Sequence, residues 1–320
     1  MRPLAVTMGD PAGIGGEALV KAWRSGALKA PFFAIDDPAR LSALGAEVEE
    51  ISAPEAAGAG GRLAVLPEPL AAPATPGAPD PANASAVIRS IERAVGFARE
   101  GRAGGVVTLP INKKALNDGA AFAYPGHTEF LAALSGAPRP VMMLAAPGLR
   151  VVPVTIHIPL REAPEQLSAA LIEETGAVLA EGLARDFGLA RPRIAVAGLN
   201  PHAGEGGAMG MEDQEIVAPA IAALKARGIE AFGPLPADTM FHAAARARYD
   251  AALCMYHDQA LIPVKMLDFA RGVNVTLGLP IIRTSPDHGT AYDIAGTGRA
   301  DPSSLIEAFA MAAEMAARRG

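Results

Sequence analysis

Cysteine, aromatic residues and charge are all scarce in this sequence. Its 320 residues include one cysteine, Cys254, so a single chain can build neither a disulfide framework nor a thiolate metal site. Charged residues make up 19%, and a net charge of −6 with both signs interspersed gives no basic footprint for nucleic acid or an anionic membrane. No apolar run approaches the roughly 20 residues that span a bilayer, and no signal-like segment follows Met1. The sequence therefore predicts a cytoplasmic protein that binds neither nucleic acid nor membrane.

Half of the residues are hydrophobic, which is enough for a sizeable core, and the length fits two domains. Short apolar runs such as LAVTM, GVVTL and RIAVAGL read as strands, and several are apolar at successive positions, as in a sheet covered on both faces. Between them lie stretches of helical spacing at 83–99, 164–187, 211–227 and 303–318. The pattern predicts an α/β protein of doubly wound character, with the proline-rich segment 66–81 as a surface connection.

Histidines gather in short polar loops at predicted strand ends. His157, His202 and His257 each follow a predicted strand, and strand ends are where open α/β sheets form ligand crevices. Three imidazoles suit a catalytic divalent metal, most readily zinc, with cobalt or magnesium-like ions left open. A structural role is the ordinary one for any single histidine, so spacing alone only suggests a metal site. The HExxH motif is absent, which removes the basis for a zincin protease.

Two glycine-rich loops follow predicted strands, and three polar residues lie in otherwise apolar surroundings. The segment 9–17, GDPAGIGGE, lacks the G-x-G-x-x-G spacing of a Rossmann fingerprint, so a tight turn and a ligand loop both remain open. The segment 204–210, GEGGAMG, suits close approach of a phosphate or a flexible lid. Lys265, Asn274 and Arg283 lie in apolar surroundings, where either an anionic ligand or a neighbouring carboxylate would be the partner.

Taken together, these motifs resemble the 4-hydroxythreonine-4-phosphate dehydrogenase family over nearly the whole chain. The matching segments are TMGDPAGIGGE, TLPINKKAL, YPGHTEFLA, TIHIPL, GLNPHAGEGG, PADTMF, YHDQALIPVK and VNVTLGLPIIRTSPDHGTAYDIAGTG. One departure is Gly16, where the family usually has proline in its opening loop. That position bears on the stiffness of the loop and carries no catalytic group.

The resemblance implies a two-domain fold like that of isocitrate and isopropylmalate dehydrogenases, with the active site in the interdomain cleft. Residues 1–127 with 270–320 would form the nucleotide-side domain, and 128–269 the domain with the metal ligands and the dimer interface. The family pattern also implies roles for individual residues. It implies one divalent metal (zinc, magnesium or cobalt) per active site, shared across a homodimer and held by His157, His202 and His257. It implies substrate contacts from His127, Thr128, Lys265, Asn274 and Arg283.

The closing segment DHGTAYDIAGTG is similar to the loop with which isocitrate and isopropylmalate dehydrogenases bind NAD without a Rossmann fingerprint. This similarity implies cofactor contacts at Gly289 and Asp293, with the choice between NAD and NADP open. The implied reaction oxidises 4-phosphooxy-L-threonine to 2-amino-3-oxo-4-phosphooxybutanoate, which decarboxylates to 3-amino-2-oxopropyl phosphate for pyridoxal 5′-phosphate biosynthesis. Lys265, with Asp258 or Asp238, is the candidate for the base that takes the hydroxyl proton.

Three other functions remain to be weighed. A related dehydrogenase would act on another phosphorylated hydroxy acid or on a dihydrodiol; Lys265, Asn274 and Arg283 favour a phosphorylated substrate, because a neutral diol would leave them poorly paired. A three-histidine metal hydrolase would use no nucleotide, and the closing HGTAYDIAG segment counts against it. A non-catalytic binding protein would have no reason for histidines at three strand ends.

Overall fold

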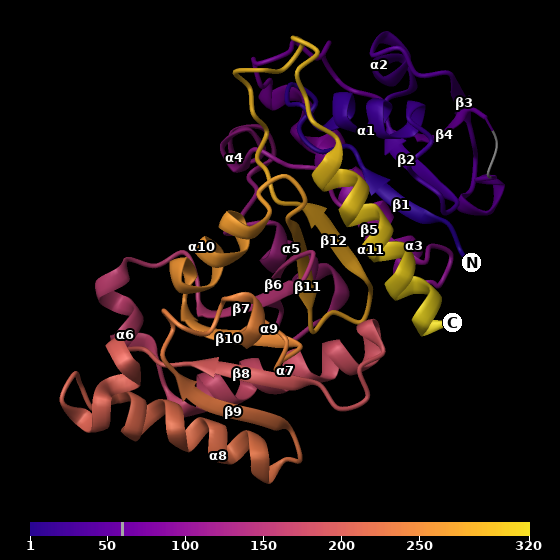
Figure 1. The fold of residues 1–320 in the computed structure, drawn as a ribbon. Helices are drawn as coiled ribbons and strands as arrows, with labels where there is room; N and C mark the ends of the chain where they lie inside the picture. Colours follow the sequence, from indigo (N-terminus) through magenta and orange to yellow (C-terminus); the bar gives the residue numbers. More distant parts are fainter. Residues whose placement is uncertain (59–60) are drawn as a thin grey trace. The chain divides into compact units, whose positions relative to one another are not determined.

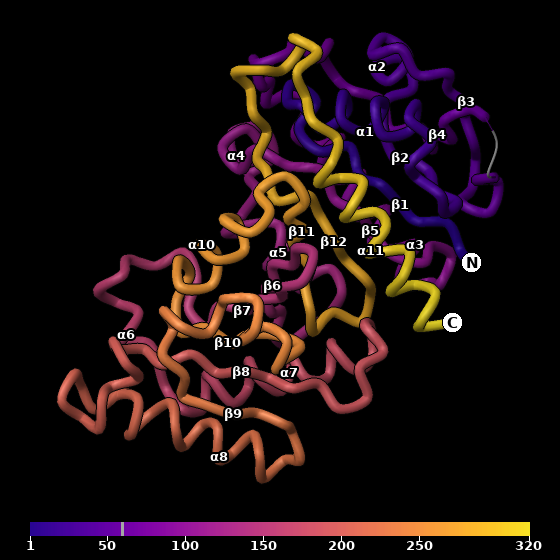
Figure 2. The backbone as a smooth tube through the Cα atoms, viewed as in Figure 1, coloured from indigo at the N-terminus to yellow at the C-terminus, as the bar shows by residue number. Residues whose placement is uncertain are grey.

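The computed structural model describes residues 1–58 and 61–320, and these divide into two compact units. The first unit comprises Met1–Pro140 and Leu279–Gly320, and the second comprises Val141–Gly278. Both ends of the chain, indigo and yellow in Figure 2, belong to the first unit. Strands alternate with helices in each unit (Figure 1), which confirms the predicted α/β class.

The boundaries of the two units differ from the predicted breaks after residues 127 and 269. Helix α5 (His127–Ser135) stays with the first unit, because its Phe130 and Leu131 are buried in that unit's core. Strand β11 (Val273–Leu277) stays with the second unit, because it pairs antiparallel with β6 (Val141–Ala146). Packing and strand pairing, which the sequence pattern does not reveal, therefore set the boundaries.

A parallel sheet with the strand order β3-β4-β2-β1-β5-β12 forms the first unit. Its strands are β1 (Leu4–Thr7), β2 (Phe32–Asp36), β3 (Val48–Glu50), β4 (Leu63–Pro67), β5 (Gly105–Val107) and β12 (Arg283–Pro286). The chain moves from β1 to β2 on one side and later enters β5 on the other side of β1. Open α/β sheets bind ligands at such a switch point, beyond the carboxyl ends of the strands.

Helices cover both faces of this sheet. They are α1 (Gly15–Arg24), α2 (Pro38–Ala43), α3 (Ala84–Arg99), α4 (Lys113–Ala120), α5 and α11 (Ser303–Arg319), with short 3₁₀ turns η1 (Pro54–Ala56) and η2 (Pro81–Asn83). The ring of Phe33 packs on Phe97 of α3 at 6.0 Å between centroids, and Phe32 packs on Phe309 of α11 at 5.2 Å. Successive strand residues point to opposite faces, so α3 and α11 cover opposite sides of the sheet, as a doubly wound fold requires.

The second unit has the strand order β11-β6-β7-β10-β8-β9. Its further strands are β7 (Leu149–Thr155), β8 (Arg193–Ala197), β9 (Glu230–Leu235) and β10 (Ala251–Tyr256). Strands β7, β10, β8 and β9 run parallel, whereas β6 is antiparallel to both of its neighbours. Cys254 lies in the centre of β10 and is wholly buried, and burial raises the pKa of its thiol, as expected for an inert cysteine.

The helices and turns of the second unit are η3 (Leu160–Glu162), α6 (Ala163–Gln166), α7 (Ala169–Phe187), η4 (Pro201–Gly207), η5 (Asp213–Val217), α8 (Ala218–Ala226), α9 (Ala243–Arg246) and α10 (His257–Leu267). The predicted helix 164–187 forms two helices, α6 and α7. The second begins after Ser168, because the Ser168 hydroxyl accepts a hydrogen bond from the Leu171 amide and caps α7. Among the described residues of both units, no helix is long and apolar enough to cross a membrane.

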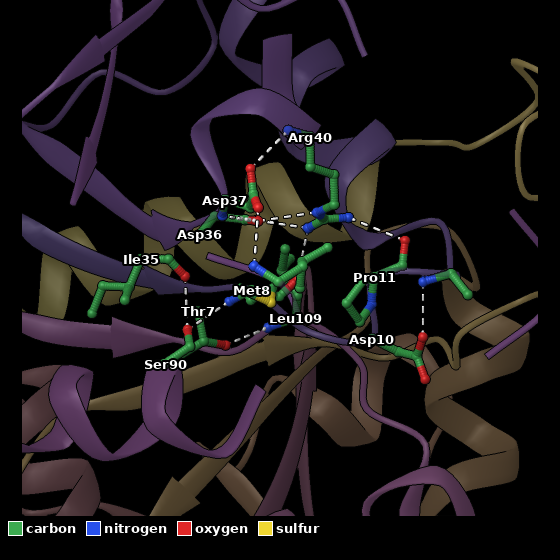
Figure 3. A network of polar contacts seen from close by, with 12 residues as sticks. Thr7, Met8, Asp10, Pro11, Ile35, Asp36, Asp37, Arg40, Ser90 and Leu109 are labelled. Carbon is green, nitrogen blue, oxygen red and sulfur yellow. Dashed lines mark hydrogen bonds and ion pairs between the residues drawn. The ribbon is translucent and has the colours of Figure 1, made fainter. Parts of the chain in front are cut away.

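A buried arginine connects the ends of β1 and β2 in the first unit (Figure 3). Arg40 forms an ion pair with Asp36, with 2.6 Å between Nη2 and Oδ2, and the two side chains are 7% and 0% exposed. The guanidinium also donates to the carbonyls of Met8 and Pro11 at 3.2 and 3.3 Å. Burial raises the pKa of Asp36, and Arg40 opposes this shift. Gly16 leaves room for the guanidinium, since a Cβ there would lie 2.7 Å from Nη1 of Arg40.

Replacing Arg40 by methionine should lower the free energy of unfolding by about 3–5 kcal/mol, because the buried Asp36 carboxylate would lose its counter-charge. Urea unfolding followed by circular dichroism measures this loss. The pKa of Asp36 is raised by burial, so its ionised form destabilises the fold increasingly as pH rises, and the loss should shrink as pH falls and the carboxylate is protonated. Arg102→Met is the control, because the Arg102–Glu55 pair is on the surface, where solvent screens the attraction and its loss changes stability little. Equal losses in both variants would contradict the argument.

Candidate functional site

The three histidines singled out from the sequence lie beyond the ends of adjacent parallel strands in the second unit. Strand β10 pairs in parallel with β7 on one side and with β8 on the other. His157 follows β7, His202 follows β8 and His257 follows β10. Because parallel strands end at the same edge of a sheet, the three histidine-bearing segments leave the sheet at one edge.

His157 and His257 are close together at this edge. Their ring centroids are 5.7 Å apart, and both line a hollow of about 300 Å³ with Leu160 and Tyr256. The carboxylate of Asp258 lies 2.7 Å from Nδ1 of His257. A carboxylate on one ring nitrogen fixes the orientation of an imidazole and leaves the other nitrogen for a ligand. The pair thus has the donor chemistry that a divalent metal requires.

The backbone at two of these histidines is in the left-handed region. His157 has φ 50° and His202 has φ 55°, a conformation that costs a residue with a side chain about 1–2 kcal/mol. Such strain is concentrated at functional sites, where the surrounding structure maintains it. Within residues 1–58 and 61–320 of a single chain, no three His, Cys, Asp or Glu side chains are grouped closely enough to hold a metal ion. One chain therefore brings together two of the three predicted ligands.

The other residues predicted for the second unit lie on separate elements. Lys265 is on α10, with its Nζ 5.5 Å from the centroid of the Phe269 ring, and Asn274 is on β11. Both are half-buried, whereas Asp238 lies in an exposed turn after β9. Among the predicted bases, Asp258 contacts a predicted metal ligand, His257.

In the first unit, the buried guanidinium of Arg283 and the half-buried ring of His127 form one site. Arg283 is 4% exposed on β12 and donates from Nε and Nη2 to the hydroxyl of Thr108, at 3.0 and 2.8 Å. Burial lowers the pKa of Arg283 to about 10, which still leaves the guanidinium charged at neutral pH. Burial, and then the charge of Arg283, holds the pKa of His127 well below its usual value. Within the described residues, Nε2 of His127 is shielded from solvent and has no hydrogen-bond partner.

His127 and Thr128 open helix α5, whose first residue follows Gly126. The free amides and the dipole at a helix N-terminus favour an anion. The buried positive charge of Arg283, which also lowers the pKa of His127, adds to the same preference. The sequence-predicted substrate residues His127, Thr128 and Arg283 therefore belong to a part of the first unit that is suited to a phosphate or a carboxylate.

The segment after β12, residues 287–302, is fastened to the loop after β1. The Tyr292 hydroxyl donates to Asp10 Oδ2 at 2.7 Å and accepts from Asn112 Nδ2 at 2.7 Å. Burial, with the hydrogen bond to Asp10, raises the pKa of Tyr292 to about 12. Asp10 and Asn112 follow β1 and β5, so this cluster lies at the switch point of the sheet.

Helix α1 fastens the same segment from its side. Lys21 Nζ donates to the carbonyls of Gly298 and Ala300 at 2.6 and 2.7 Å, and Glu17 accepts from the amide of Gly296. The two predicted cofactor residues, Gly289 and Asp293, are exposed on this anchored segment. A loop that is anchored but open at these positions can present its backbone to a ligand.

Sequence reasoning did not identify the residues that make these anchors. Asp10, Asn112 and Tyr292 hold the closing segment, and Asp213 and Gln259 bind backbone groups around His202 and His257. Asp10, Asn112 and Gln259 each lie in a polar cluster near the end of a predicted strand, the signal that drew attention to the histidines. Their partners are distant in sequence, so the pattern could not assign their roles.

Comparison with known proteins agrees with the family resemblance indicated by the sequence motifs. The family model for the pyridoxal phosphate biosynthetic protein PdxA matches residues 26–312. The chain is 58% identical to the 4-hydroxythreonine-4-phosphate dehydrogenase of Paracoccus denitrificans over 322 residues, covering 99% of each chain. It is 54% identical to the enzyme of that name from Caulobacter vibrioides, covering 100% of this chain and 99% of the relative.

Solved structures give the same result for the fold. The crystal structure of 4-hydroxythreonine-4-phosphate dehydrogenase from Klebsiella pneumoniae matches with a TM-score of 0.91 and 43% identity, covering 99% of this chain and 100% of that one. A terephthalate 1,2-cis-dihydrodiol dehydrogenase from Burkholderia xenovorans matches with a TM-score of 0.68 and 27% identity, covering 97% of both chains. The similarity is thus much greater to the first of these enzymes.

His127 should remain neutral in the ligand-free protein at pH values where ordinary histidines titrate, because burial and Arg283 both disfavour its protonated form. NMR of the histidine ring protons, with His127→Asn to assign the signal, measures this. In the unfolded chain His127 would protonate near pH 6.5, so it should reduce stability as pH falls below about 6.5. A His127 signal that titrates with a midpoint near 6.5 would contradict this description of the site.

Proposed function

We infer the function of this chain from the family to which it belongs, that of the pyridoxal phosphate biosynthetic protein PdxA. Its relatives make it an oxidoreductase of the 4-hydroxythreonine-4-phosphate dehydrogenase type. We propose that it oxidises 4-phosphooxy-L-threonine to 2-amino-3-oxo-4-phosphooxybutanoate, with NAD or NADP and a divalent metal. This product would lose carbon dioxide to give 3-amino-2-oxopropyl phosphate. The identity of 58% over the full length is the observation that carries the proposal.

The proposed metal ligands are His157, His202 and His257, and the ion would be zinc, magnesium or cobalt. The closeness of His157 to His257 and the carboxylate on Nδ1 of His257 support this assignment. A bound divalent cation would polarise the substrate hydroxyl and favour loss of its proton. In this arrangement Asp258 orients His257, which makes it a weaker candidate for the base than the sequence suggested.

Lys265 is then the preferred base for the hydroxyl proton, with Asp238 as the second candidate. Lys265 lies on the helix that begins at His257 and is partly shielded by its own unit. Its neutral amine could accept the proton during oxidation. The same side chain, with Asn274, is a proposed contact for the anionic groups of the substrate.

The first unit is proposed to bind a substrate anion and the cofactor. Arg283, with His127 and Thr128 at the start of α5, provides a buried positive charge and helix amides, which suit a phosphate or carboxylate. Gly289 and Asp293 are the proposed nicotinamide-cofactor contacts, on a segment that its anchors hold in a fixed conformation. The nicotinamide would accept the hydride from the substrate carbon.

We propose that the enzyme is a homodimer. Apolar side chains are exposed along α10 and just beyond it, with Ile262 62%, Met266 87% and Phe269 75% exposed. Exposed apolar patches mark interaction sites, and this one is on the helix that begins at the proposed ligand His257. A second copy of the chain is the proposed partner, because one chain groups only two of the three proposed ligands. If two chains associate through this patch, the exposed apolar side chains are covered and the second chain can supply the missing metal ligand.

The proposed activity is tested by absorbance of reduced nicotinamide when the purified enzyme receives 4-phosphooxy-L-threonine and NAD or NADP. We expect a rate that disappears on chelation and returns with zinc, cobalt or magnesium, because a divalent metal is needed to polarise the hydroxyl. Tight NAD binding without a rate would indicate a related dehydrogenase with another substrate. Metal-dependent hydrolysis without nucleotide binding would indicate the hydrolase instead.

The variant Lys265→Met tests whether Lys265 is the base that accepts the hydroxyl proton. Its turnover at neutral pH should fall by about 10²–10⁴-fold if Lys265 accepts the proton, while metal binding is retained. Unaltered turnover would exclude Lys265 as the base and leave Asp238 to be tested.

Dimer formation should be lost when a charge is placed on the exposed apolar patch. Met266→Glu and Phe269→Glu should each sediment as a single chain of 32.7 kDa, whereas the unaltered protein should have twice that mass, because burying an unpaired carboxylate in an apolar interface is unfavourable. Analytical ultracentrifugation measures this. Ala222→Glu, at an exposed position of α8, is the control and should remain dimeric. A dimer in all three variants would place the interface elsewhere.

A further inference from the structure

We propose that Asp213 and Gln259 are positioning residues that hold the His202 loop and the His257 strand end in place for metal binding. The proposal rests on the metal site proposed above. Neither side chain is itself a proposed ligand. Each binds backbone groups of the segments that carry the histidines.

The loop that carries His202 requires external support. From His202 to Gly207 every residue has a positive φ, including Ala203 at 54° and Glu205 at 42°. Residues with a Cβ are disfavoured in this region, so such a run does not persist without compensating contacts. The amide of Gly198 still donates to the carbonyl of Leu235 on β9 at 2.8 Å, but the amides of Leu199 and Asn200 lie past the paired residues of β8.

Asp213 supplies those contacts. Its side chain is 0% exposed, and its carboxylate accepts hydrogen bonds from the amides of Leu199 at 2.7 Å and Asn200 at 3.0 Å. A third bond comes from Asn200 Nδ2 at 3.0 Å. The carboxylate fits closely, since a Cβ on Gly198 would lie 2.8 Å from Asp213 Oδ1. The segment between β8 and His202 is therefore held by one buried carboxylate.

Gln259 connects this segment to the strand that carries His257. Its Nε2 donates to the carbonyl of Gly198 at 2.7 Å, and its Oε1 accepts from the amide of Met255 at 2.7 Å. The last paired residues of β8 and β10 are Val196 and Leu253, so the side-chain amide of Gln259 continues the connection between the two strands beyond their paired residues. The 8% exposure of Gln259 keeps water from competing for these bonds.

The strand that carries His157 is attached to the same point. The hydroxyl of Thr155 donates to the carbonyl of Met255 at 2.8 Å. Met255 thus has its amide bound by Gln259 and its carbonyl bound by Thr155. These contacts form a continuous series across the ends of β7, β10 and β8, and they fix the spacing of the three histidine-bearing segments.

The test is Co²⁺ binding to the chelator-stripped full-length protein, followed by the visible absorption of the bound ion. Asp213→Asn should weaken Co²⁺ binding by about 10–100-fold, the usual effect of losing a residue that orients metal ligands. Asparagine has the same shape, but it places an N–H donor against amide donors of the loop. Hydrogen exchange provides a second readout: the amides of residues 199–207 should exchange faster in the variant.

Asp186→Asn is the matched control, because Asp186 is another buried carboxylate of the same unit, 1% exposed and paired with Arg185 on α7. It should leave Co²⁺ affinity and exchange in 199–207 unchanged. Gln259→Glu is the second variant in case Asp213→Asn does not fold; its ionised side chain cannot donate to Gly198, so it should also weaken binding. Affinity and exchange equal to those of Asp186→Asn in the variants that fold would overturn the proposal.

The outcomes separate this proposal from the proposed function. If the unaltered protein binds Co²⁺ and the variants bind it equally well, the positioning role is wrong and the metal site stands. If the unaltered protein does not bind Co²⁺, both the metal site and the role proposed for its supports are wrong. The nicotinamide assay then decides independently whether the chain is a dehydrogenase.

Discussion

Backbone groups just beyond the ends of parallel strands have no neighbouring strand to pair with, and the functional loops of this protein depend on the buried side chains that bind those groups. In the first unit Arg40 binds the carbonyls after β1. In the second unit Asp213 binds the amides after β8. Both side chains are nearly inaccessible to water, so displacing either loop would leave buried hydrogen-bonding groups without these partners. The contacts therefore stabilise both loops.

The two units offer different chemistry because they place polar groups at different depths. The second unit has imidazoles of His157 and His257 beside a hollow at the strand ends, where an ion can reach them. The first unit buries the guanidinium of Arg283, and burial strengthens its attraction for an anion. That same positive charge helps to keep His127 neutral. The second unit is therefore suited to a metal ion and the first unit to an anion.

The sequence predicts those parts of the structure that depend on local pattern. Helices α3 and α11 follow the predicted stretches, and the histidines do lie beyond the strands that their apolar runs indicated. Strand β12 was not predicted, because its residues are polar; they are buried because Thr284 donates to the carbonyl of Ala308 and Arg283 donates to Thr108. Asp258 was predicted as a base, but its contact with His257 depends on side-chain geometry. The spacing of residue types along the chain does not reveal contacts between residues that are distant in sequence, or contacts that depend on side-chain rotamers.

The sequence lacks the G-x-G-x-x-G motif, and in the structure the corresponding loop and strand end make internal contacts. In a Rossmann fold, the loop after the first strand binds pyrophosphate through free amides, and an acidic residue after the second strand binds the ribose. Here Asp36 at the end of β2 is fully buried against Arg40, and the amide of Ile14 donates to the carbonyl of Thr290. Both elements are committed to internal contacts, so a nucleotide could bind there only by breaking them. The loop after β1 supports residues 287–300 instead, which agrees with the proposal that the cofactor contacts the exposed part of that closing segment.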